Sequence, residues 1–505
     1  MGASSFLFAF FIPLAVAYFK GPKSIHDRIA IVGAGPAGIH MAYLLKEKGF
    51  KNIKVLENGD EIGGKSKTIM YRGAAQELGT CYVSPDYTDV IELINKFVPE
   101  SLIPFPSASV WLENQSDPIT YQQYLFRFAS KLLKTSNLDG IKYAIVTAIK
   151  KYNFLHKSLF GEYEGELMPR PSQETLLKIN STFLQYITLN NLEILQPIFE
   201  VSTTMQGYGH LNEIAALYGL MWNTPRFMIA FLTRMNGDER NAGMHVLKNG
   251  FQNLWKTIVI KENINVIYNV NIKLVDRNYT QPDGPIIRLF KSHGKRLPKW
   301  EEFDFLIWSP EMQQSINLWD NVTPLEKKLF SNTTCTYFTS SIVNYVDKIR
   351  GFTPIDYWID NMNKKIEHSV WAQRDTYSVI NGYKGYLYRN KTFPLGEDFN
   401  PTKTVITYQM ADELPNVKDL EDALLKQMKY FGDGITILKQ MTWRYFPRYS
   451  LEQIQQGVLW DIFDMQGHYG MWYIGSSVSF ESIKSVVQYN QLLLKKLDLY
   501  EDNVM

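Results

Sequence analysis

The chain has 505 residues, 45% of them hydrophobic and 21% charged, so it can bury a large core and is not intrinsically disordered. Its 53 basic and 51 acidic residues leave a net charge of +2, which gives no reason to expect nucleic acid as a partner. Its two cysteines, Cys81 and Cys335, exclude a disulfide scaffold but allow one bridge, and the eight scattered histidines predict no metal site.

The N-terminus predicts a signal peptide over residues 1–17. An apolar run at 6–16 ends in small residues, and we expect cleavage after Ala17. The run has about half of the roughly 20 residues that a membrane-spanning helix needs, so a stable anchor is the weaker alternative. A secreted or secretory-lumen glycoprotein is expected, with six acceptor sequons: Asn114, Asn180, Asn278, Asn321, Asn332 and Asn390.

Residues 28–57 have the spacing of a βαβ unit that binds a dinucleotide. A buried strand at 28–32 leads into a glycine-rich turn, and an amphipathic helix follows until Gly49. The next strand, 53–57, ends in Glu57. Three glycines alone are a weak signal, but the strand, the helix and the acidic residue around them make the interpretation specific.

Each part of the turn has a physical role in this interpretation. Gly33 allows the tight turn, Gly35 lets the backbone approach a pyrophosphate, and Gly38 lets helix and strand pack. The pyrophosphate meets the unpaired amides at the positive end of the helix, and Glu57 accepts hydrogen bonds from an adenosine ribose. The expected cofactor contacts in this unit are Gly33, Gly35, Pro36, Ala37, Gly38 and Glu57.

The residues that follow favour FAD over NAD. Gly63, Gly64 and Lys65 place two glycines and a cation just past the ribose carboxylate. The chain can therefore fold over the pyrophosphate from its second side, a clasp that simple NAD domains lack. We expect non-covalently bound FAD.

The rest of the chain predicts two interleaved domains. Helical periodicity dominates 120–240, strand patterns return at 264–268 and 303–308, and a strand at 471–474 precedes a helix at about 482–496. The expected class is α/β, with a Rossmann-like FAD-binding domain interleaved with an α+β substrate-binding domain. The FAD domain is predicted at 26–105, 241–320 and 440–497, and the substrate domain at 106–240 and 321–439.

Together these motifs resemble the flavin amine oxidase superfamily. A closer resemblance is to polyenoic fatty acid isomerases and to secreted dehydrogenases of the cyclopiazonate type. It is carried by four stretches, 207–210, 249–255, 443–448 and 473–481. The resemblance implies a fold of the amine oxidase and glutathione reductase type. It also implies Gly79 near the flavin ring, Val270 against the adenine through its backbone, and Gly475 with Ser476 near the ribityl chain.

The resemblance further implies a flavin N5 that accepts a hydride from an activated carbon of a hydrophobic small molecule. An isomerase returns the hydride to the same molecule, whereas an oxidase passes the electrons to dioxygen. The leading hypothesis is dehydrogenation or double-bond isomerisation of a polyunsaturated, lipid-like substrate. The alternatives are an amine or L-amino-acid oxidase that releases hydrogen peroxide, and a secreted FAD-binding protein without turnover. Substrate identity, electron acceptor and oligomeric state stay open.

Four residues are catalytic candidates: Tyr208, His210, Tyr445 and Arg448. For Tyr208 and His210, packing in a tight Gly-Tyr-Gly-His turn is an equal alternative. Tyr445 also fits a ring cage, and Arg448 is a carboxylate clamp or a salt-bridge partner. In the isomerase that binds a fatty acid, an arginine in this region binds the carboxylate of the substrate. Residues 105–110 of this chain contain no arginine, so the sequence does not establish a free fatty acid as the substrate. Residues 331–345 contain no lysine, which weighs against amine oxidation.

Overall fold

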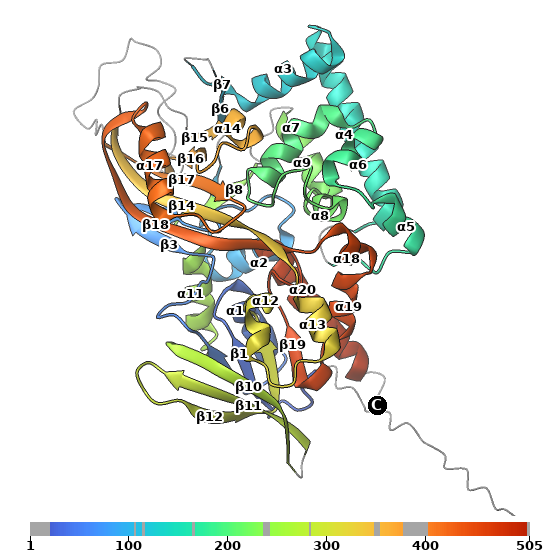
Figure 1. Ribbon diagram of the computed structural model, residues 1–505, viewed down its shortest axis with the longest axis vertical. Helices are drawn as coiled ribbons and strands as arrows, with labels where there is room; N and C mark the ends of the chain where they lie inside the picture. The colour runs from blue at the N-terminus through green and yellow to red at the C-terminus, as the bar shows by residue number, and fades with distance from the viewer. Residues whose placement is uncertain are drawn as a thin grey trace, which may run out of the picture.

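The computed structural model describes residues 21–105, 108–113, 117–163, 167–235, 243–281, 284–347, 354–376 and 402–501. The predicted signal peptide and the sequons at Asn114 and Asn390 lie outside these residues. The chain forms a Rossmann-like body, drawn in the lower part of Figure 1, and a second body of helices and a long sheet above it. The predicted α/β fold class is confirmed.

The lower body is built on a parallel five-stranded sheet with the order β19-β13-β1-β2-β9. Its strands come from distant parts of the chain: β1 (Arg28–Val32), β2 (Asn52–Leu56), β9 (Val266–Ile267), β13 (Phe305–Trp308) and β19 (Met471–Tyr473). In β1 and β13 the paired residues are continuously apolar and buried, as parallel strands covered on both faces require. The predicted strands at the start and end of the chain therefore meet in one sheet.

Helices cover this sheet and tie its distant segments together. They are α1 (Pro36–Glu47), α2 (Thr88–Phe97), α11 (Phe251–Lys261) and α20 (Ile483–Glu501). Proline at the first position of α1 is already set for helical geometry. The buried side chain of Asn490 in α20 donates to the Ala37 carbonyl of α1 at 2.8 Å. The last helix thus rests directly on the glycine-rich turn.

A three-stranded antiparallel sheet lies beside the parallel sheet (Figure 1). Its strands are β10 (Val270–Gln281), β11 (Gly284–His293) and β12 (Lys299–Phe303). Two small antiparallel pairs lie nearer the second body: β3 (Thr68–Tyr71) with β4 (Ala74–Glu77), and β5 (Leu102–Pro104) with β8 (His245–Leu247). Short helices follow at α12 (Met312–Ser315), α13 (Pro324–Phe330), α18 (Leu451–Gln455) and α19 (Val458–Asp464).

The upper body combines a mixed seven-stranded sheet with a helical layer. The sheet order is β18-β14-β17-β16-β15-β6-β7. The strands are β6 (Ser109–Trp111), β7 (Ile119–Thr120), β14 (Thr334–Asp347), β15 (Ile355–Trp358), β16 (Val370–Arg374), β17 (Thr402–Ala411) and β18 (Gly432–Arg448). The long strands β14 and β18 run from this sheet toward the Rossmann-like body (Figure 1), so the two bodies share a wall.

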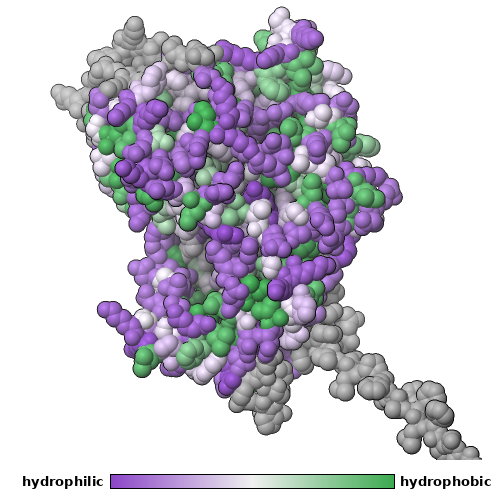
Figure 2. Space-filling view, viewed as in Figure 1, coloured by the Kyte–Doolittle hydropathy of each residue, from purple (hydrophilic) through white to green (hydrophobic). Residues whose placement is uncertain are grey.

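The helical layer arises from the stretch whose periodicity predicts helices. It contains α3 (Tyr121–Leu133), α4 (Leu138–Phe160), α5 (Gln173–Lys178), α6 (Phe183–Leu189), α7 (Gln196–Phe199), α8 (Ala216–Trp222) and α9 (Pro225–Met235). Two further helices pack on the sheet, α14 (Ile359–Asn363) and α17 (Val417–Met428). No helix among the described residues is long and apolar enough to cross a membrane. Figure 2 shows polar and apolar side chains interspersed over one face of the molecule.

Candidate functional site

One large cavity lies where the two bodies meet. Its volume is about 980 Å³, at the upper end of the range for small-molecule sites. The glycine-rich turn and Glu57 line one part of it, and residues of β16, β17 and α9 line another. A single cavity therefore joins the predicted dinucleotide site to the upper body.

The turn after β1 has the close backbone packing that its glycines predict. Gly33 has a φ of +94°, a conformation that other residues rarely adopt. A Cβ atom on Gly38 would lie 2.0 Å from the Gly33 carbonyl oxygen, so only glycine fits there. A Cβ on Gly64 would lie 3.1 Å from the Cα of Gly35. The second glycine pair thus faces the first, as the proposed clasp over a pyrophosphate requires.

Glu57 joins this turn to the end of β2. One carboxylate oxygen accepts the Ala34 amide at 2.7 Å, and the other accepts the Gly59 amide at 2.7 Å. The side chain also lines the cavity. Since each carboxylate oxygen can accept more than one hydrogen bond, Glu57 retains acceptor capacity for the hydroxyls of a ribose.

Most of the predicted cofactor residues line this one cavity: Gly33, Gly35, Pro36, Ala37, Glu57, Gly64, Lys65, Gly79, Gly475 and Ser476. Gly38 and Gly63 lie behind the surface, where they permit close packing. Val270 is not among the residues that line the cavity, and its backbone amide donates to the Glu57 carbonyl at 2.8 Å. Its backbone contact with adenine stays a prediction.

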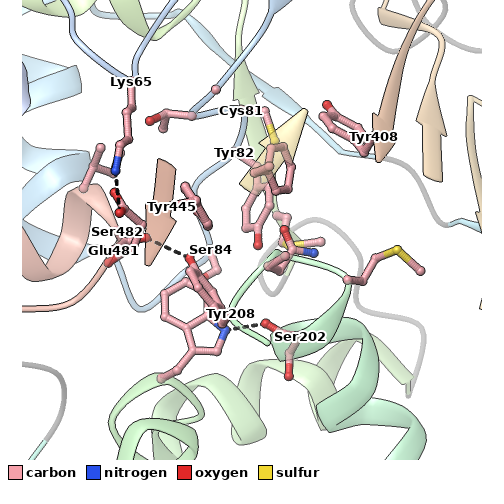
Figure 3. Close-up of a pocket in the computed structure, with 18 of the residues that line it drawn as sticks. Lys65, Cys81, Tyr82, Ser84, Ser202, Tyr208, Tyr408, Tyr445, Glu481 and Ser482 are labelled. Atoms are coloured by element: carbon pink, nitrogen blue, oxygen red, sulfur yellow. Dashed lines mark hydrogen bonds and ion pairs between the residues drawn. The ribbon is translucent and has the colours of Figure 1, made fainter. Parts of the chain in front are cut away.

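An aromatic cluster forms the cavity wall beside Lys65. The rings of Tyr208 and Tyr445 stack with centroids 5.8 Å apart, and the Tyr208 hydroxyl donates to the Glu481 carbonyl at 3.0 Å. The Lys65 ammonium pairs with a Glu481 carboxylate oxygen at 2.6 Å, as Figure 3 shows. Burial raises the pKa of Tyr208 far above its ordinary value, so its phenol stays protonated at neutral pH. This wall can therefore position a ligand with its rings and a neutral hydroxyl, but Tyr208 does not act as a base at neutral pH.

His210 and Arg448 are not among the residues that line the cavity, so the cavity lends no support to their catalytic roles, which stay predictions. The His210 ring instead contacts the edge of Trp371, with centroids 5.5 Å apart. The Arg448 guanidinium lies 5.7 Å from the ring of Phe446. The backbone explains both positions. The turn at Gly209 separates the side chains of Tyr208 and His210, and the positive φ of Phe446 turns the chain between Tyr445 and Arg448.

Sequence reasoning missed a polar group on the opposite wall. Arg374 at the end of β16 and Tyr408 in β17 both line the cavity, together with Cys81 and Tyr82. Figure 3 shows Tyr408 across the pocket from Lys65, with Cys81 and Tyr82 between them. Cys81 and Cys335 are free thiols. The signal available in the sequence was an arginine at the end of a short strand whose other residues are mostly apolar, an unusual place for a buried charge.

An apolar arm extends the cavity under the helical layer. It is lined by side chains from α3, α7 and α9 and from the segments around them: Phe105, Leu125, Ile198, Val201, Met205, Phe227, Phe231, Met235 and Met244. Methionine side chains adapt to irregular ligands, and the aromatic rings give broad contact area. This part of the cavity can bury a hydrophobic molecule.

In the described part of the chain, a Rossmann-like body and a second body with a mixed seven-stranded sheet share one cavity. Residues 31–97 match the family of the NAD(P)-binding Rossmann-like domain. The chain is 23% identical to the polyenoic fatty acid isomerase of Ptilota filicina over 95% of its own length and 97% of that protein. The crystal structure of the CLA-producing fatty acid isomerase from P. acnes superposes with a TM-score of 0.74 at 20% identity, covering 94% of this chain and 99% of that one.

A shorter match connects the chain to amine oxidation. It is 32% identical over 104 residues to the putrescine oxidase of Kocuria rosea, which covers 20% of this chain and 22% of that protein. The comparisons confirm the predicted resemblance to flavin amine oxidase-like proteins, and with it the expectation of an enzyme.

Proposed function

We propose that this chain is an FAD-dependent oxidoreductase that removes a hydride from a hydrophobic small molecule and either dehydrogenates it or moves a double bond. One observation carries the proposal: a single cavity has a dinucleotide turn at one end and an apolar arm at the other. Hydride transfer requires cofactor and substrate to lie in contact with correct orientation, and a shared cavity provides this.

The residues present fit a flavin dinucleotide. Gly35 and Gly64 both line the cavity without side chains, so a pyrophosphate can approach their backbones, and Glu57 offers acceptors for the adenosine ribose. The bound flavin would supply the hydride acceptor, and the protein supplies placement and exclusion of water. Because Tyr208 and Tyr445 are held as stacked, protonated rings, we assign them to the wall that orients the reactants.

The charges on the cavity wall favour a neutral or anionic substrate over an amine. Four carboxylates line the cavity, and each already has partners among the described residues. Glu481 pairs with Lys65 at 2.6 Å, Glu311 pairs with Arg444 at 2.8 Å, and Asp86 pairs with buried Lys484. Glu57 accepts two backbone amides. An ammonium substrate would therefore have to displace an existing partner in order to find an anion.

Anaerobic mixing of the flavin-loaded enzyme with polyunsaturated lipids tests the proposal. A dehydrogenase or oxidase is expected to bleach the flavin and leave it reduced, whereas an isomerase is expected to turn over without net reduction or oxygen uptake. A peroxide assay across amines and L-amino acids tests the alternative supported by the putrescine oxidase match. Flavin that no lipid, amine or amino acid reduces, together with no product in any of these assays, would contradict the proposal.

We also propose secretion of the mature chain, supported by the predicted signal peptide. The sequon asparagines Asn180, Asn321 and Asn332 are exposed, as glycosylation requires. N-terminal sequencing of the protein recovered from culture medium, and its mobility shift after glycosidase treatment, test this proposal. A chain that stays in the cytosol with its initiator methionine would contradict it.

A further inference from the structure

One of the three cations on the cavity wall has no carboxylate partner. Lys65 and Arg444 form ion pairs, but no carboxylate among the described residues lies within ion-pair distance of Arg374. Arg374 is only 2% exposed. Its Nη2 atom reaches the Glu77 carbonyl at a long 3.5 Å, and its Nε atom has no partner in the described part of the chain. A buried charge in this state is costly unless a ligand completes its bonding.

The strand register places a second hydrogen-bond donor beside Arg374. Arg374 is opposite Ile406 and Ala372 is opposite Tyr408, so Arg374 and Tyr408 lie on one face of adjacent strands. The Tyr408 hydroxyl is buried, and among the described residues it interacts only with the weakly bonding Cys81 thiol. Two donors therefore border the same part of the cavity.

The nearby carboxylate of Glu77 attracts the Arg374 charge but does not form a hydrogen bond or ion pair with it. Its two oxygens accept the Thr68 hydroxyl and the Phe251 amide, both at 2.6 Å. These bonds hold the Glu77 side chain at the start of α11, behind the cavity surface. The guanidinium of Arg374 is therefore left facing a cavity whose remaining wall is largely apolar.

We propose that Arg374, assisted by Tyr408, binds a carboxylate group of the substrate and selects acids over neutral or cationic molecules of the same length. A guanidinium presents parallel N–H groups that match the two oxygens of a carboxylate, and the tyrosine hydroxyl can donate a further bond. The apolar arm would then hold the chain of the same amphiphilic acid. This inference rests on the proposed function, because it concerns the same cavity.

The test is equilibrium binding of three probes of equal chain length to the flavin-loaded protein: palmitate, hexadecanol and hexadecylamine, each below its aggregation limit. Quenching of tryptophan fluorescence follows binding, since Trp222 and Trp443 line the cavity, and calorimetry gives the affinities. The wild-type protein should bind palmitate at least about 10-fold more tightly than hexadecanol, the range for hydrogen bonds to a charged group.

Four variants test which side chain causes the preference for palmitate. Arg374→Gln should reduce the preference for palmitate to within about threefold, and Arg374→Lys should keep part of it because the charge remains without the planar fork. Tyr408→Phe should reduce it about threefold. Arg288→Gln is the control, a half-buried arginine of β11 outside the cavity that pairs with Asp276, and should leave the preference unchanged. If Arg374→Gln does not fold, the palmitate preference of Arg374→Lys and Tyr408→Phe still tests the inference.

Several results would overturn the inference. They are equal affinities for the three probes, a preference for hexadecylamine, no binding of any probe, or a full palmitate preference in Arg374→Gln. Loss of FAD from Arg374→Gln with unchanged lipid affinities would assign the residue to the cofactor instead. A colourless wild-type protein would contradict the proposed function, but tryptophan fluorescence would still test Arg374.

Discussion

The two ends of the cavity are built from different parts of the chain. The dinucleotide end is made mainly of backbone from one short stretch, with Gly33, Gly35 and Gly64 brought close together and Glu57 bonded to two amides. The opposite end is made of side chains from separate strands and helices, including Arg374 and the apolar arm. In the proposed function, cofactor recognition therefore depends on a local stretch of sequence, whereas substrate recognition depends on side chains that only folding brings together.

The largest effect is expected at Gly38. A methyl group there would collide with the Gly33 carbonyl, so Gly38→Ala should destabilise the protein by about 3 kcal/mol and abolish flavin binding. Gly35→Ala is the matched control, since its Cβ would meet only the Gly64 Cα at 3.8 Å and its φ is −76°. That variant should fold but bind FAD more weakly. Urea unfolding and flavin content measure both changes, and equal behaviour of the two variants would contradict the assigned roles.

Loss of the Glu57 charge should weaken the cofactor end specifically. Glu57→Gln cannot accept the Ala34 and Gly59 amides and a ribose as strongly as the carboxylate does, so FAD affinity should fall on the order of 10- to 100-fold. Its exposed neighbour Asp60 is the control, and Asp60→Asn should leave the affinity unchanged. Fluorescence titration of the apoprotein with FAD gives both values. An unchanged affinity in Glu57→Gln would remove this residue from the site.

A pH dependence of stability is expected from Glu77, which lies between the two ends. Burial raises its pKa from the ordinary 4.5 to about 7, so the folded protein binds this proton more tightly than the unfolded chain does. This contribution to the free energy of unfolding should therefore fall as the pH rises from about 4.5 to about 7, by at most about 1.4 kcal/mol per pH unit. Glu77→Gln should flatten the profile in that window. A profile with unchanged slope in the variant would exclude Glu77 as its source.

The smallest effect is expected at Tyr208, which we assign to the wall. Tyr208→Phe removes the hydrogen bond to the Glu481 carbonyl but keeps the ring, so the stability loss should be about 1 kcal/mol. Tyr143→Phe, at a side chain that is 76% exposed, should cost nothing measurable. Flavin reduction by substrate should slow less than 10-fold in Tyr208→Phe, in the range of one lost hydrogen bond. A loss of several orders of magnitude would make Tyr208 a catalytic residue.

The same contrast explains what the sequence could predict. The βαβ spacing around Gly33 and Glu57 depends on neighbours in the chain, and so it predicted the fold class, which is confirmed, and candidate cofactor residues that mostly line one cavity. The positions of His210 and Arg448 outside the cavity lining could not be predicted, because the backbone turns at Gly209 and Phe446 decide which way each side chain faces. Arg374 belongs to no sequence motif, so the sequence did not mark it as a candidate. Its lack of an ion pair depends on which carboxylates bond to other residues in the folded protein.

The flavin content of the purified full-length protein tests the central claim most directly. Acid precipitation followed by chromatography of the supernatant should yield one FAD per chain, released without covalent attachment to the protein. A colourless protein that takes up no FAD on reconstitution would contradict the account of the glycine-rich turn and of the cavity built on it.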